Sequence, residues 1–208
     1  MGSSMPLLQV DGLRKHYTRG WPRRETTFRL AAHFSVHEPQ VIGVMGPNGS
    51  GKTTLFELLT GMNRPTAGRV CVAGQDIHQV RRSERDRLAI HYHQSYQVRA
   101  FHRGKPDVLL QRAGRSKPLV HLFDEPQFNT QDGYIGFMLD FFRQLRSEGH
   151  VVFLCVHPNE RFQLEILREI CERFLFVNKG VVTQAPDFDT LVQDPAVRNY
   201  LGALAPTR

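Results

Sequence analysis

The stretch that decides the fold is VIGVMGPNGSGKTTLFELL, from Val41 to Leu59. It begins with an unbroken apolar run that ends at Met45, which is typical of a strand buried on both faces of a parallel sheet. A glycine-rich turn follows, and Lys52 and Thr53 then open a segment with helical apolar periodicity. The pattern fits G-x-x-x-x-G-K-[ST] at every fixed position, so we expect a strand, a phosphate-binding turn and a helix in that order.

The turn carries the residue types that bind phosphate. Glycines let successive backbone N–H groups point at one anion, and a helix N-terminus adds partial positive charge. In such a loop the lysine reaches the β- and γ-phosphates, and the next hydroxyl binds Mg²⁺. The sequence therefore predicts a catalytic contact for Lys52 and a metal ligand in Thr53. The predicted phosphate-binding residues are Gly46, Pro47, Asn48, Gly49, Ser50, Gly51, Lys52, Thr53 and Thr54.

Length and composition fit an ordinary globular chain. The 208 residues suit one large α/β domain or two small ones, and 40% of them are hydrophobic. We expect no membrane span and no secretory leader, because no apolar run is long enough and no leader pattern opens the chain. Residues 1–4 resemble a cloning remnant, so the domain is expected to cover 5–208. The three cysteines lack C-x-x-C spacing, which predicts buried, reduced thiols in a cytosolic protein.

The chain is basic, with a formal net charge of +7. Such a balance favours an anionic partner, such as nucleic acid, a membrane surface or nucleotide phosphates, although solubility alone explains it at least as well. No basic stripe alternates with aromatic residues, so nucleic acid is not an expected partner.

Apolar strand patterns alternate with amphipathic helix patterns along the chain. Strands are expected at 7–10, 28–36, 41–45, 69–73, 89–93, 119–123, 151–156, 174–178 and 181–185. Helices are expected from 52 until Gly61, and at 78–88, 107–116, 132–148, 159–172, 187–193 and 195–203. This order predicts an α/β fold with a mostly parallel sheet, helices on both faces, and an antiparallel β portion near the N-terminus.

Ligands of such sheets gather at the carboxyl ends of the strands. An apolar strand there delivers Asp124 and Glu125, which predicts that Asp124 holds Mg²⁺ opposite Thr53 and that Glu125 is the general base for an attacking water. A merely acidic strand end is a weak alternative beside an intact phosphate loop.

Two histidines near the end of another strand invite a metal site. His91 and His93 share one face of the strand at 89–93. No third ligand is indicated, so a structural role is expected for both.

These motifs resemble those of the ATP-binding cassette (ABC) ATPases, the nucleotide-binding subunits of membrane transporters. The resemblance covers nearly the whole chain: 46–53 is similar to Walker A, 122–126 to Walker B, and 65–77 to the family's P-T-S-G…G-x-x-I hairpin. It implies that Tyr17 stacks on adenine, Gln94 contacts Mg²⁺ or water, and His157 contacts the γ-phosphate. It also implies the P-loop NTPase fold of the ABC type, with ATP and Mg²⁺ as ligands and ATP hydrolysis as the reaction.

The chain departs from the family pattern between Gln94 and Asp124, which are 30 positions apart. The family places a helical subdomain and the signature L-S-G-G-Q there, whereas the matching segment here is Ala100-Phe101-His102-Arg103-Gly104. We therefore expect a single ABC-type domain that lacks most of that subdomain, shortened around 95–106. In addition, 128–131 replaces the family's S-G-L-D loop, and Pro158 follows His157.

In the family two subunits enclose two ATP molecules, and the signature of one completes the site of the other. A degenerate signature implies pairing with a different subunit, unless Arg103 or His102 substitutes as a cationic contact. The resemblance thus implies an ATPase subunit of an ABC-type transport system, weak alone, held at the cytoplasmic face of the inner membrane by a transmembrane permease. Two alternatives stay open: a nucleotide-binding switch or assembly module with little hydrolysis, and an ATP-dependent nucleic-acid binder.

Overall fold

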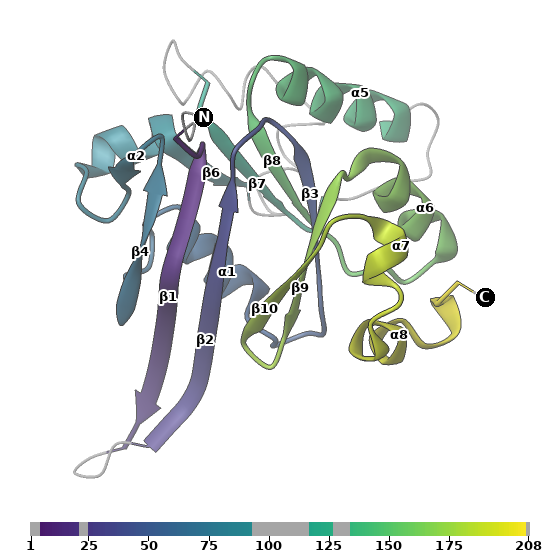
Figure 1. The fold of residues 1–208 in the computed structure, drawn as a ribbon, viewed down its shortest axis with the longest axis horizontal. Coiled ribbons are helices and arrows are strands. Elements are labelled where there is room, and N and C mark those ends of the chain that lie inside the picture. The colour runs from purple at the N-terminus through teal and green to yellow at the C-terminus, as the bar shows by residue number, and fades with distance from the viewer. Residues whose placement is uncertain (1–4, 21–24, 93–116, 127–133, 207–208) are drawn as a thin grey trace.

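The computed structural model describes residues 5–20, 25–92, 117–126 and 134–206. Within them, ten strands form one mixed sheet in the order β5-β4-β1-β2-β10-β9-β3-β8-β7-β6 (Figure 1). The strands are β1 (Leu8–Arg19), β2 (Glu25–Val36), β3 (Val41–Met45), β4 (Ala67–Val72), β5 (Gln75–Asp76), β6 (Ala89–Tyr92), β7 (Val120–Asp124), β8 (Val151–Cys155), β9 (Arg173–Asn178) and β10 (Val181–Ala185). The helices are α1 (Lys52–Leu59), α2 (Arg82–Leu88), α5 (Tyr134–Ser147), α6 (Arg161–Ile170), α7 (Phe188–Leu191) and α8 (Pro195–Leu201), followed by the 3₁₀ turn η1 (Gly202–Leu204). The α/β fold with an antiparallel N-terminal part is confirmed.

The parallel half of the sheet runs β9-β3-β8-β7-β6. Every residue of β3, β7 and β8 is buried, as unbroken apolar runs predict for strands covered on both faces. Strand β8 lies between β3 and β7. The carboxyl ends of β3 and β7 therefore open at the same edge of the sheet, one strand apart.

The first strand is longer than the predicted range 7–10, because it continues through Gly12 to Arg19. The pairing of β1 with β2 shifts register between Val10 and Leu13, and Gly12 has a φ of +54°. A bulge with a glycine in the left-handed region explains this, since the bulge absorbs an extra residue without ending the ladder. Leu13 is fully buried beyond it.

The predicted helix at 78–88 begins later than expected, at Arg82. Asp76 holds the chain in a turn before it: a carboxylate oxygen accepts from the N–H of His78, and its carbonyl accepts from the N–H of Gln79 and Val80. Such a turn competes with helix for the same backbone groups.

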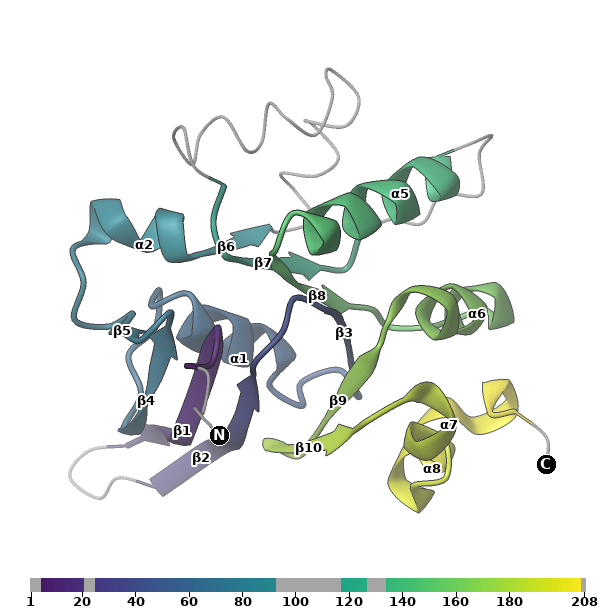
Figure 2. The ribbon, with the colours of Figure 1, turned by 45° about the horizontal axis from the view of Figure 1, so that its top comes forward.

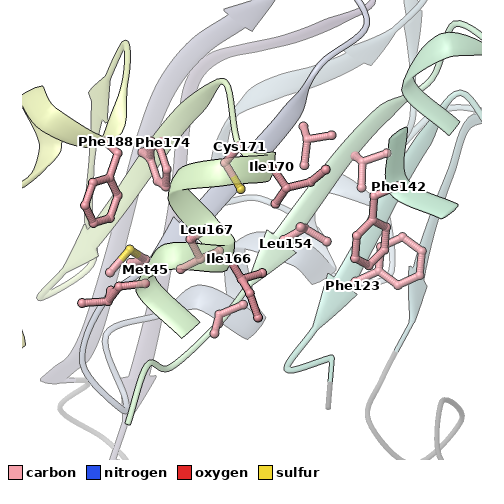
Figure 3. Close-up of a cluster of buried hydrophobic side chains, with 14 of the residues drawn as sticks. Met45, Phe123, Phe142, Leu154, Ile166, Leu167, Ile170, Cys171, Phe174 and Phe188 are labelled. Atoms are coloured by element: carbon pink, nitrogen blue, oxygen red, sulfur yellow. The ribbon is translucent and has the colours of Figure 1, made fainter. Parts of the chain in front are cut away.

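Two apolar layers cover the sheet. One packs α1 against β1, β2 and β4 and includes Ile42 and Val44 of β3. The other packs α5, α6 and the C-terminal helices against the opposite face, which receives Val41 and Met45 (Figure 3). Figure 2 shows α5 and α6 side by side along the sheet. Helix α5 buries an apolar stripe that includes Met138, Phe142 and Leu145.

None of the helices in the described part of the chain is long and apolar enough to cross a membrane. The three cysteines are all unbridged. Cys155 and Cys171 are buried as expected, whereas Cys71 on β4, near the edge of the sheet, is only half-buried.

Candidate nucleotide-binding site

The glycine-rich loop leaves β3 at Gly46 and enters α1 at Gly51. Both positions require glycine: Gly46 has a φ of +149°, and a Cβ there would lie 2.0 Å from the carbonyl oxygen of Val177. At Gly51 the φ is +110°, and a Cβ would lie 2.7 Å from the ring of Phe28. The loop is therefore pressed against β9 and β2. Among the described residues no side chain caps the N-terminus of α1, so its first N–H groups are left for another acceptor.

Lys52 lies across this loop rather than out in solvent. Its side chain is buried, and Nζ donates to the carbonyl oxygens of Gly46 at 2.7 Å and Pro47 at 2.9 Å. These contacts use two of the three ammonium protons and hold the loop curled. Ser50 is buried as well, and within the described residues its Oγ has no hydrogen-bond partner. The loop thus presents buried polar groups with unused capacity.

Asp124 at the end of β7 meets Thr53 at the start of α1. Thr53 Oγ1 donates to Asp124 Oδ2 at 3.2 Å. Burial of Asp124 opposes ionisation, but hydrogen bonds from His91, the Cys155 thiol and Thr53 outweigh it and lower the pKa of the carboxyl. The pair therefore presents a hydroxyl and a carboxylate together, which are oxygen ligands of the kind that a hard cation prefers.

His91 of β6 is a site residue whose contact sequence reasoning missed. Its side chain is fully enclosed, and Nε2 lies 3.3 Å from Asp124 Oδ2. It was expected to be structural, and it does pack edge-on against Phe56 with ring centroids 5.3 Å apart. The pairing of β6 with β7 as parallel neighbours could have indicated this contact, because it places His91 beside Leu122, two residues before Asp124. Its neighbour His93 lies outside the described residues.

Glu125 follows Asp124 with an unusual backbone. Its φ is +51°, a left-handed conformation that residues other than glycine adopt rarely. The N–H of Glu125 donates to the carbonyl of Cys155 at 2.9 Å, which fixes this conformation. Strained backbones of this kind persist where the surroundings hold them, often at functional sites. The Glu125 residue is exposed toward the pocket described next.

One pocket of about 370 Å³ brings most of the predicted groups together, a size suited to a small ligand. Its walls are Tyr17, Phe28, Asn48, Gly49, Gly51, Lys52, Thr53, Thr54, Asp124 and Glu125. Tyr17 thus lies in the same pocket as the loop; the residue is 36% exposed, and its hydroxyl accepts from Asn63 Nδ2 at 2.6 Å. Phe28 was not predicted as a site residue, and its ring lies 6.2 Å from that of Tyr17.

The remaining predicted site residues do not line this pocket or lie outside the described residues. Gly46, Pro47 and Ser50 belong to the loop but not to the pocket wall. His157 follows β8 and lies outside that wall, with its Nδ1 2.8 Å from the hydroxyl of Tyr200. Gln94 lies outside the described residues, as do the segment Ala100–Gly104, the predicted helix at 107–116 and the loop at 128–131.

Several known sequences similar to this chain are ATP-binding proteins of transport systems. The family model described as ABC transporter matches residues 31–107. The lipoprotein-releasing system ATP-binding protein LolD 1 of Rhodopseudomonas palustris is 28% identical, over 85% of this chain and 98% of that protein. The cytochrome c biogenesis ATP-binding export protein CcmA of Escherichia coli K12 is 44% identical, over 32% of this chain and 32% of that protein.

Solved structures share the fold. A nucleotide-free ATP-binding cassette from an ABC transporter superposes with a TM-score of 0.70 at 17% identity, covering 94% of this chain and 98% of that one. The cassette MJ0796, solved as a dimer in a post-hydrolysis state with ADP and phosphate, gives 0.63 at 14% identity, covering 86% and 98%. The chain is thus similar to the ATP-binding proteins of ABC transporters in its family-model match and in its alignment with LolD 1, and it shares the fold of their cassettes.

Proposed function

We propose that this chain binds ATP with Mg²⁺ in the 370 Å³ pocket and hydrolyses it as the ATPase subunit of a membrane transport system. One observation carries the proposal. Thr53 Oγ1 lies 3.2 Å from Asp124 Oδ2, and Lys52 and Glu125 line the same pocket. A loop for phosphates, two oxygen ligands and a carboxylate base are the parts that phosphoryl transfer to water requires.

The chemistry of the donor set fits Mg²⁺. Thr53 and Asp124 would hold the ion, with Gln94 as the third ligand that the family pattern implies. When bound, Mg²⁺ neutralises charge on the phosphate oxygens. The lowered pKa of Asp124 suits this role, because an ionised carboxylate is the form that binds a cation.

The remaining residues divide the work on ATP. Tyr17 stacks on adenine. The loop N–H groups and the third N–H of the Lys52 ammonium group bind the phosphates. Glu125 accepts a proton from the attacking water as general base. His157 donates to the γ-phosphate and steadies it.

The transport role is proposed from the relatives. LolD 1 and CcmA are named as ATP-binding proteins of a lipoprotein-releasing system and of an export process. By analogy this chain docks on a transmembrane permease subunit at the cytoplasmic face of the inner membrane. The membrane contact is made through that partner.

Pairing with a different ATPase subunit extends the proposal. The sequence has no L-S-G-G-Q between Gln94 and Asp124. The LolD 1 alignment runs over 229 positions, more than the 208 residues of this chain, which supports a shortened domain. A partner with an intact signature would complete the site. The same observation favours the second candidate, a nucleotide-binding switch with little hydrolysis.

ATP turnover of the purified chain tests the proposal. The wild type is compared with Glu125→Gln and with a matched control, Glu169→Gln, whose exposed carboxylate pairs with Arg143 on the surface. We expect Glu125→Gln to keep ATP affinity and lose turnover by about a hundredfold or more, with the control unchanged. Full activity in Glu125→Gln would rule out its role as base.

The dependence of ATP turnover on protein concentration distinguishes a homodimer from a complex that needs another subunit. Turnover that rises with the square of concentration indicates a working homodimer and contradicts the need for another subunit. Tight ATP binding without turnover at any concentration supports a missing partner. If no phosphate is released even after a permease and a second subunit are added, a nucleotide-binding switch replaces the ATPase subunit as the proposed function.

A further inference from the structure

The C-terminal helix α8 places Tyr200 against the residues that follow β8. The phenol ring packs on Phe176 of β9, with centroids 5.8 Å apart, and on the ring of His157 at 5.7 Å. Its hydroxyl lies 2.8 Å from His157 Nδ1. The helix itself is anchored, because Val197 and Leu201 are buried and Asp194 caps its first turn through the N–H of Ala196. The packing of the ring and of α8 therefore fixes the position of the hydroxyl.

The direction of this hydrogen bond follows from the partners of the phenol. Burial raises the pKa of Tyr200 to about 12, against a smaller lowering of the pKa by the backbone of Gly46. The hydroxyl thus keeps its proton at neutral pH and needs an acceptor. Among the described residues, the acceptor in contact is His157 Nδ1. Tyr200 therefore donates to His157.

We propose that Tyr200 is a positioning residue that fixes His157 as the tautomer with its hydrogen on Nε2. A neutral imidazole whose Nδ1 accepts a hydrogen bond must carry its proton on the other nitrogen. This inference rests on the proposed function, in which His157 donates to the γ-phosphate: only the Nε2–H tautomer has a donor free for that contact. The wrong tautomer would present a lone pair to an anion.

The same hydroxyl connects two parts of the site. Gly46 begins the phosphate-binding loop, and His157 follows the neighbouring strand β8. One phenol on α8 thus hydrogen-bonds to the histidine and lies near the first residue of the loop. This explains why an aromatic residue far along the chain bears on a site built mainly from 46–54 and 124–125.

Nitrogen-15 NMR of the histidine rings tests the tautomer directly. Spectra are recorded at about pH 8, above the ordinary histidine pKa of about 6.5, and His157 is assigned by the signals lost in His157→Gln. The wild type is compared with Tyr200→Phe and with Asn199→Ala, an exposed neighbour on α8. We expect wild type and Asn199→Ala to show one tautomer, with Nε2 protonated, and Tyr200→Phe to show a mixture. The other histidine signals report whether each variant remains folded.

Two outcomes overturn the proposal at this level. A proton on Nδ1 of His157 in the wild type would reverse the hydrogen bond. A Tyr200→Phe spectrum like that of the wild type would show that the phenol does not select the tautomer. Neither reading depends on ATP hydrolysis, so a failure of the proposed function leaves the test intact.

Kinetics then test whether the tautomer matters. In Tyr200→Phe we expect kcat to fall about tenfold while KM for ATP changes less than about twofold, because the contact acts when charge develops on the γ-phosphate. An altered tautomer with unchanged kcat would overturn the positioning role. A wild type that hydrolyses no ATP even with a permease and a second subunit present would refute the proposed function instead.

Discussion

Replacing His91 with leucine should weaken the Mg²⁺-dependent part of nucleotide binding. The His91 side chain is fully enclosed, and its Nε2 lies 3.3 Å from Asp124 Oδ2, so leucine removes a donor that water cannot replace. Hydrogen bonds to charged groups contribute about 1.5–3 kcal/mol. The separation of 3.3 Å is long, so the lower figure applies. About 1.5 kcal/mol corresponds to about a tenfold loss of affinity.

A fluorescent ATP analogue, titrated with Mg²⁺ and with EDTA, measures this effect. We expect Kd in Mg²⁺ to rise about tenfold and Kd in EDTA to stay unchanged, because Asp124 acts through the ion. His91→Gln keeps a nitrogen donor at the ε position and serves as the matched control, which should recover most of the affinity. Equal changes with and without Mg²⁺, or none in Mg²⁺, would refute the link between His91 and the metal ligand.

Three further changes probe the loop, the core and a buried histidine. Gly46→Ala should abolish binding of the ATP analogue, because a Cβ 2.0 Å from the Val177 carbonyl adds a clash to the roughly 1–3 kcal/mol of backbone strain. Phe142→Ala should lower the free energy of unfolding by about 3–5 kcal/mol in urea, whereas Phe137→Ala on the same helix, where the residue is 45% exposed, should change it by less than about 0.5 kcal/mol. Burial lowers the pKa of His121 to about 3. The unfolded chain therefore binds an additional proton below about pH 6.5, and stability should fall by about 2 kcal/mol between about pH 6.5 and pH 5, and further toward pH 3. In urea titrations at these two pH values, the His121→Gln variant should lack this part of the change in the free energy of unfolding. A pH dependence equal to that of the wild type would contradict a neutral, buried His121.

Local patterns predicted the centre of the fold and of the site. The run Val41–Met45 and the loop after it specify a buried strand, a tight turn and a helix start within a few residues of each other. The pairing of Thr53 with Asp124 followed because both lie at the carboxyl ends of parallel strands or just beyond them. These features depend on residues that are close in the sequence, so they can be predicted from a single sequence.

What the sequence did not reveal depends on contacts between distant segments. The sequence pattern predicts that the first strand ends at Val10, and only the pairing of β1 with β2 identifies Gly12 as part of a bulge. Phe28 and His91 reach the site, and Tyr200 reaches His157, through strand order and helix docking, which no spacing rule specifies. Roles for Gln94 and for Ala100–Gly104 remain predictions, because both lie outside the described residues.

The central place of β3 has a consequence for synthesis of the protein. Its neighbours are β8 and β9, so Val41 pairs with Val152 and Ile42 with Arg173. Pairings of such long range form slowly, and during synthesis the chain emerges from the ribosome N-terminus first. The glycine-rich loop is made early, yet its strand has no partners on either side until most of the chain has emerged. A nascent chain that ends before β9 would carry every residue of the loop and still have no nucleotide site.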